Sequence, residues 1–157
     1  MNKNDNILEN QHLIMKNVLS YRGKVTQTES MLVSKKIDDI LKENNATKNG
    51  SVVTVTHSIE MQDGQPVFDF EMKIPLDKPI TVSDEFEFIP EFALENALKA
   101  RVIGSPQVLE GMMKELKEYM DDNDLTPLSP AYIATVKEAK TQAEINDMII
   151  DIYVAVK

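Results

Sequence analysis

The chain has 157 residues, 42% of them apolar, and a formal net charge of −9. That length suits about one ordinary domain with a sizeable core. The acidic balance argues against nucleic-acid binding, because lysine and arginine must neutralise phosphates there. The sequence contains no cysteine, which excludes disulfides, thiolate nucleophiles and cysteine metal sites.

The N-terminal residues 1–11 are polar and rich in asparagine, and we expect a flexible arm. The sequence contains no apolar stretch typical of a signal peptide and no run near the ~20 apolar residues that span a bilayer. We therefore expect a cytoplasmic protein with no membrane partner. The arm is too short to hold a helix-turn-helix, so we also expect no DNA-binding domain in this chain.

The first half, residues 12–76, is predicted to form a strand, a helix and two strands. Apolar residues recur with period two from Leu13 to Tyr21, interrupted by Asn17, and this strand is expected to end at Gly23. Thr26 and Glu29 have the spacing of a capping box, so a helix should follow and fade near Asn44.

Two strands, residues 53–59 and 68–74, are then predicted around a hairpin turn at Asp63-Gly64. Alternation places Val53, Val55, His57 and Ile59 on one face of the first of these strands. His57 on that apolar face is predicted to be a hydrogen-bonded core histidine. His12 and His57 are far apart in the sequence, so no metal site and no cofactor are predicted.

Residues 77–90 are predicted to join the two halves, because prolines there remove hydrogen-bond donors and the charge pattern changes. Acidic residues interleave with Phe86, Phe88 and Phe92 around the end of this segment. Two interpretations stay open: a solvated edge with its aromatic rings turned inward, or an acidic docking surface.

The second half, residues 91–157, repeats the order of the first. A strand ends at Gly104, Ser105 is a candidate N-cap, and Pro106 suits the first helical position. Strands follow around 132–136 and 148–156. The stretches 68–74 and 150–156 alternate alike at a constant offset of 82 residues, and Gly23 matches Gly104 at an offset of 81. We interpret this as a structural duplication.

The predicted fold is therefore α+β: two β-α-β-β repeats form a largely antiparallel curved sheet, with two helices on one face. The helices should cover the face that bears Phe68, Phe70, Met72, Ile150, Ile152 and Val154.

The opposite face then carries Asp69, Glu71, Asp151 and Tyr153. Carboxylates beside an aromatic ring attract a cation through charge and the ring quadrupole. The alternative is that these are ordinary solvent-facing strand residues.

The strand and turn Val102-Ile103-Gly104-Ser105-Pro106, the helix ending at Leu116–Met120 and the closing hairpin resemble the GyrI-like family. This family comprises the effector-binding domains of bacterial multidrug-responsive regulators and free-standing relatives. The resemblance covers His12 to Lys157, and it implies a groove between the halves that binds cationic or aromatic compounds. A glutamate two residues before a tyrosine commonly anchors the cation in the family. Here the tyrosine matches Tyr132, and Pro130 occupies the position of the glutamate.

The leading functional hypothesis is a protein that binds a small cationic or aromatic molecule, with Asp69, Glu71, Tyr132, Asp151 and Tyr153 lining the groove. One alternative is a hydrolase of reactive electrophilic drugs, in which Glu71 and Tyr153 activate water. Another is a protein-interaction or accessory protein, such as one associated with type VII secretion. No catalytic residue is assigned in the leading hypothesis.

Overall fold

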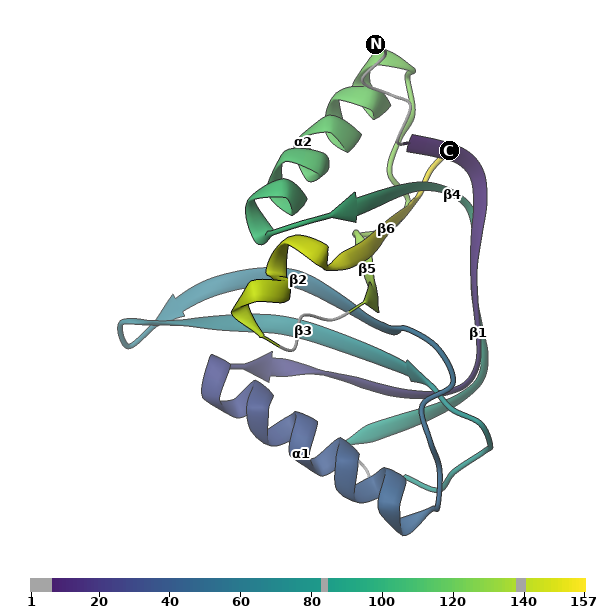
Figure 1. The fold of residues 1–157 in the computed structure, drawn as a ribbon, viewed down its shortest axis with the longest axis vertical. Coiled ribbons are helices and arrows are strands. Elements are labelled where there is room, and N and C mark those ends of the chain that lie inside the picture. The colour runs from purple at the N-terminus through teal and green to yellow at the C-terminus, as the bar shows by residue number, and fades with distance from the viewer. Residues whose placement is uncertain (1–6, 83–84, 138–140) are drawn as a thin grey trace. The chain divides into compact units, whose positions relative to one another are not determined.

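The computed structural model describes residues 7–82, 85–137 and 141–157. Within these residues the fold is α+β, with antiparallel strands and two α-helices, as predicted (Figure 1). No helix in this part of the chain is long and apolar enough to cross a membrane. The elements in chain order are β1 (Ile7–Val25), α1 (Gln27–Glu43), β2 (Val52–Gln62), β3 (Gln65–Pro75), β4 (Phe86–Ile103), α2 (Pro106–Asp122), β5 (Tyr132–Lys137), a 3-10 helix (Gln142–Asp147) and β6 (Ile149–Ala155).

The chain divides into two compact units. The first unit is Ile14–Phe92, and the second is the chain up to Leu13 together with Ala93–Lys157. Strands β1 and β4 each run from one unit into the other. Strand β1 begins at Ile7, inside the segment assigned to the arm, and β4 begins at Phe86, inside the segment assigned to the joint. Residues 1–6 and 83–84, which belong to those two segments, lie outside the described residues.

In the first unit, α1 packs on one face of β1 and β3. Val33, Ile37 and Leu41 of α1 are buried together with Leu19 of β1 and Ile74 of β3. These helix positions form the apolar stripe that helical periodicity brings to one side. The face of β3 that carries Phe70 and Met72 therefore faces the helix, as predicted.

In the second unit, α2 covers β4 and β6 in the same way. Met112 and Leu116 of α2 are buried with Leu98 and Ala100 of β4 and with Ile152 of β6. Ile150 and Val154 belong to the same apolar cluster. Each helix thus covers the strand face that the alternation pattern assigned to it.

The N-termini of the two helices are capped differently. The Thr26 hydroxyl accepts a hydrogen bond from the Glu29 amide at 3.2 Å, and a Glu29 carboxylate oxygen accepts one from the Thr26 amide at 3.0 Å. This is the predicted capping box. Ser105 holds the equivalent position before α2, but its side chain makes no capping hydrogen bond.

This difference leads to a first prediction. Thr26→Ala should lower the free energy of unfolding by about 1 kcal/mol, because the Glu29 amide loses the hydroxyl that caps it. Ser105→Ala should cost clearly less, since no side-chain bond is lost there. Urea denaturation of both variants measures the difference, and equal costs would contradict it.

The structural duplication is present, but its offset differs from the predicted one. The N-caps Thr26 and Ser105 are 79 residues apart, and so are the C-caps Asn44 and Asn123. Asn17 and Asn96 are also 79 apart, and both have a positive φ, 53° and 52°. The carbonyl of each accepts a hydrogen bond, from the amides of Leu76 and Val156 respectively. These amides are 80 residues apart, so β3 matches β6 at an offset of 80.

The offsets of 82 and 81 are therefore corrected. At an offset of 80 the equivalent of Glu71 is Asp151, and the equivalent of Lys73 is Tyr153. The register supports this match, since Glu71 pairs with Arg22 and Asp151 pairs with Arg101. The predicted match of Asp69 with Asp151 was wrong by one full period of the strand, an error that leaves every side chain on the same face.

The predicted single face of β2 is interrupted by a bulge. The pairing of β2 with β3 shifts between Thr56 and Ser58, which places His57 at the irregularity. A bulge of this kind reverses the alternation that follows it. Val53 and Val55 are fully buried, whereas Ile59 beyond the bulge is 60% exposed. Strand β5 has the equivalent shift between Thr135 and Lys137.

Candidate functional site

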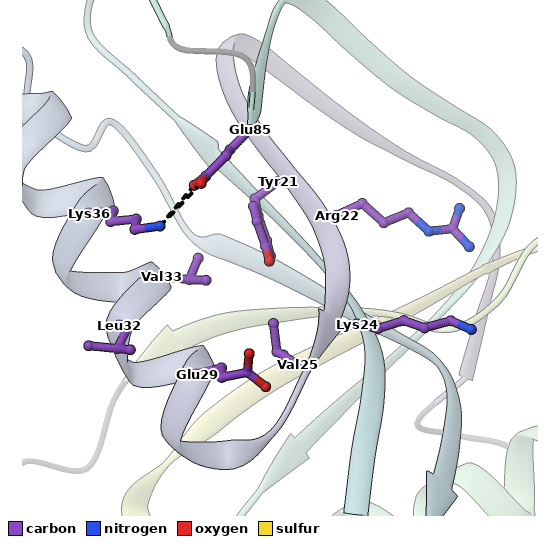
Figure 2. Close-up of a pocket in the computed structure, with 9 residues that line it drawn as sticks. All are labelled: Tyr21, Arg22, Lys24, Val25, Glu29, Leu32, Val33, Lys36 and Glu85. Atoms are coloured by element: carbon purple, nitrogen blue, oxygen red, sulfur yellow. Dashed lines mark hydrogen bonds and ion pairs between the residues drawn. The ribbon is translucent and has the colours of Figure 1, made fainter. Parts of the chain in front are cut away.

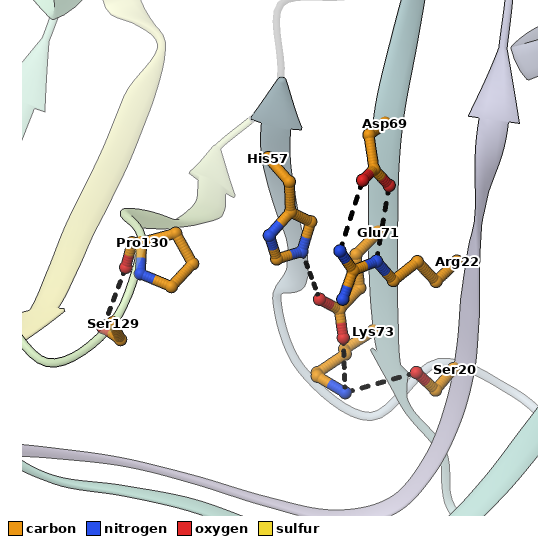
Figure 3. Close-up of polar contacts among 8 residues, drawn as sticks. All are labelled: Ser20, Arg22, His57, Asp69, Glu71, Lys73, Ser129 and Pro130. Carbon is orange, nitrogen blue, oxygen red and sulfur yellow. Dashed lines mark hydrogen bonds and ion pairs between the residues drawn. The ribbon is translucent and has the colours of Figure 1, made fainter.

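A polar cluster lies on the face of β1, β2 and β3 that points away from α1. We call it the first polar cluster, and Figure 3 shows its members: Ser20, Arg22, His57, Asp69, Glu71 and Lys73. The register sets Ser20 opposite Lys73 and Arg22 opposite Glu71. Val53 and Val55 of β2 lie opposite Lys73 and Glu71 on the same face. The cluster is therefore flanked by buried apolar side chains.

Glu71 is at the centre of this cluster. Its Oε1 lies 2.8 Å from Nε2 of His57, and its Oε2 lies 3.0 Å from Nζ of Lys73. The side chain of Glu71 is 14% exposed and that of Lys73 only 6%. Burial alone would raise the pKa of Glu71, but the hydrogen bonds from His57 and Lys73 outweigh it and hold that pKa below its ordinary value. Glu71 is thus a carboxylate at neutral pH, and His57 has the hydrogen bond predicted for it.

The Lys73 ammonium contacts three different groups. Besides Glu71, it donates a hydrogen bond to the Ser20 hydroxyl at 3.2 Å. It also lies 4.8 Å from the centroid of the Phe92 ring, within the range of a cation–π interaction. A carboxylate, a hydroxyl and an aromatic ring therefore hold one buried cation.

Asp69 lies at the more exposed end of the cluster. Its carboxylate accepts hydrogen bonds from Nε and Nη2 of Arg22, at 3.3 and 3.2 Å. These bonds lower the pKa of Asp69 from its ordinary value. The Arg22 side chain is 55% exposed, so this ion pair is largely hydrated and of modest energy.

Two cavities of similar volume occur among the described residues of the first unit. One, of about 370 Å³, adjoins the first polar cluster and is lined by Ser20, Arg22, Glu71, Lys73, Glu85, Phe86 and Glu87. The other, of about 350 Å³, lies between α1 and β1, and Figure 2 shows its lining. There Tyr21 and Val33 flank the Lys36–Glu85 ion pair of 3.0 Å. Burial, followed by the charge of Glu85, raises the pKa of Tyr21.

The second unit has a comparable cluster around Asp151. The Asp151 carboxylate accepts hydrogen bonds from Nε and Nη2 of Arg101 at 2.8 and 3.0 Å, and it lies 3.7 Å from Nζ of Lys99. The bond to Asp151 raises the pKa of Arg101. Lys99 Nζ also lies 5.7 Å from the centroid of the Tyr153 ring. We call Lys99, Arg101, Asp151 and Tyr153 the second polar cluster.

The five predicted groove residues are divided between the units. Asp69 and Glu71 lie in the first polar cluster, and Asp151 and Tyr153 lie in the second. Tyr132 begins β5 and pairs with Tyr153 in the register. The structure adds resident cations that the sequence pattern did not predict: Arg22, Lys73, Lys99 and Arg101 neutralise the three carboxylates. Their signal in the sequence was their position on the same strand faces as the acids.

Pro130, where the resemblance to GyrI-like domains implies a glutamate, lies in the segment before β5. Its neighbour Ser129 donates a hydrogen bond to the Pro130 carbonyl at 2.8 Å (Figure 3). The Ser129 hydroxyl also accepts a hydrogen bond from the Ala155 amide at 3.0 Å. This segment therefore supplies a backbone contact to the end of β6. Residues 127–131, next to β5, contain no carboxylate.

Comparison with protein-family models and with curated proteins found no match. Among solved structures, the chain is similar to the EcmrR C-terminal domain, with a TM-score of 0.71 and 16% identity over 96% of this chain and 95% of that domain. It covers 56% of EcmrR in the EcmrR–DNA complex, with a TM-score of 0.70 and 16% identity.

Two proteins from Listeria innocua share the fold at lower identity. An uncharacterised conserved protein has a TM-score of 0.65 and 9% identity over 94% of this chain and 91% of that one. A hydrolase has a TM-score of 0.59 and 8% identity over 96% and 90%. These similarities confirm the predicted resemblance at the level of the fold.

Proposed function

We propose that this chain, which has the fold of GyrI-like effector-binding domains, binds small organic molecules and prefers cationic aromatic compounds to anionic ones. The observation that supports the cationic preference is the setting of Lys73. Glu71 and the Phe92 ring hold a largely buried ammonium group there. These are the groups that recognise organic cations in proteins.

The cavity beside the first polar cluster supports the choice of site. It has a volume of about 370 Å³ and is lined by Glu71, Phe86 and Glu87, among others. That volume lies within the range of small-molecule sites, which extends from about 300 to 1,000 Å³. Glu71 is the proposed main determinant, because it is ionised and the least exposed carboxylate of this cluster.

The affinity is expected to be weak. A ligand cation must compete with the resident cations Lys73 and Arg22, and Pro130 provides no carboxylate. We expect a Kd on the order of micromolar to millimolar, equivalent to about 4–8 kcal/mol of binding free energy.

Calorimetry with benzyltrimethylammonium, benzyl alcohol and benzoate tests this proposal, since the three differ in charge and share one ring. The parent protein should bind the cation most tightly. Glu71→Gln keeps the shape of the side chain and removes its charge. It should therefore weaken binding of the cation and leave binding of benzyl alcohol unchanged. Circular dichroism confirms that each variant is folded at the temperature used. Equal binding of all three compounds by the parent, or no loss in Glu71→Gln, would contradict the proposal.

A further inference from the structure

We propose that Lys73 is the specificity-determining residue of this site, because its ammonium occupies the position that a ligand's cation would take. An organic cation then binds by displacing Lys73. This inference rests on the proposed function. It also gives the reason for the low affinity that we expect for organic cations.

The contacts of Lys73 are those of a bound cation. The ammonium lies 3.0 Å from a Glu71 oxygen, 3.2 Å from the Ser20 hydroxyl and 4.8 Å from the Phe92 ring centroid. Few lysines are as buried as this one, and a buried ammonium requires such partners. The same carboxylate and ring would serve a ligand of the same charge.

The second unit repeats this arrangement with a lysine from a different strand. Lys99 belongs to β4 and is the equivalent of Ser20, whereas Tyr153 of β6 is the equivalent of Lys73. The Lys99 ammonium still lies near a carboxylate, Asp151, and an aromatic ring, that of Tyr153. Two lysines at non-equivalent positions thus provide an internal cation beside equivalent carboxylates. Because this arrangement recurs in both units, the internal cation is a shared feature of the two repeats and does not depend on one particular lysine position.

Displacement of Lys73 is sterically reasonable. Its four-carbon stem is flexible, and the lysine lines the cavity of about 370 Å³. Glu87 lines the same cavity and is exposed, so its carboxylate is available to the displaced ammonium. The ion pair between Glu71 and the ligand replaces the ion pair between Glu71 and Lys73. Only the difference in free energy between these two pairs contributes to ligand affinity.

The test compares benzyltrimethylammonium binding by the parent, Lys73→Gln and Lys35→Gln. Lys73→Gln removes the internal cation and keeps a donor for Ser20 and Glu71, so it should bind the cation at least about ten-fold more tightly. Lys35→Gln makes the same change of charge at an exposed position on α1 and should bind as the parent does. Lys73→Met is a second variant in case the glutamine form is poorly folded.

A second measurement follows Lys73 itself in the parent. Saturating benzyltrimethylammonium should increase acylation of Lys73 by an amine-reactive reagent, read by mass spectrometry, and leave acylation of Lys35 unchanged. If the parent and the Lys73 variants bind the cation equally and Lys73 stays protected, the role of Lys73 is wrong and the proposed function stands. If neither the parent nor any variant binds the cation, the proposed function itself fails.

Discussion

Leu116→Ala and Ile152→Ala should each lower the free energy of unfolding by about 2–5 kcal/mol, as is usual when a large buried aliphatic side chain is truncated. Leu116 on α2 is 1% exposed and Ile152 on β6 is 0% exposed. Both belong to the apolar cluster of the second unit. Each truncation removes buried methyl groups and leaves a cavity that the neighbouring strands fill only in part.

Matched controls are available on the same kinds of element. Met113 on α2 is 37% exposed and Ile103 on β4 is 59% exposed. Truncating either residue to alanine should lower the free energy of unfolding by well under half as much as Leu116→Ala or Ile152→Ala does, since little packing is lost. Midpoints of urea denaturation at constant m-value provide the comparison. Unchanged midpoints for Leu116→Ala or Ile152→Ala would mean that the core assignment of that element is wrong.

The fold was largely predictable because its signals are local. Helical periodicity, the Thr26–Glu29 spacing and strand alternation each depend on neighbouring residues, and all three are present in the structure. The offset between the halves was not predictable in this way. A strand repeats every two residues, so alternation cannot distinguish an offset of 80 from one of 82. The hydrogen bonds from the Leu76 and Val156 amides to Asn17 and Asn96, together with the strand register, settle the offset of 80.

The candidate site was predictable only as a strand face. Alternation correctly placed Asp69 and Glu71 opposite the helix-facing residues of β3. It did not reveal that this face is partly buried, because its apolar neighbours Val53 and Val55 come from β2, whose pattern the bulge at His57 interrupts. Arg22, which forms an ion pair with Asp69, is 47 residues away from it in the sequence. Pairings at that separation depend on strand register, which one sequence does not specify.

Glu71→Gln should lower the free energy of unfolding by about 3 kcal/mol, near the lower end of what removal of one partner of a buried ion pair costs. The change removes the negative charge that compensates the Lys73 ammonium, which is only 6% exposed. Lys73→Gln should cost less, because His57 still contacts Glu71 at 2.8 Å. Asp69→Asn is the control, since it breaks the more exposed pair with Arg22 and should cost about 0–1 kcal/mol.

The double variant Glu71→Gln, Lys73→Gln separates the ion pair from the effects of each single change. With both charges gone no uncompensated ion remains, so the double variant should be more stable than the sum of the two losses by about 0.5–3 kcal/mol. Urea denaturation of all four proteins at pH 7 measures this coupling energy. Additive losses would show that Glu71 and Lys73 act independently, and a loss for Asp69→Asn as large as for Glu71→Gln would show that burial of the pair is not the cause.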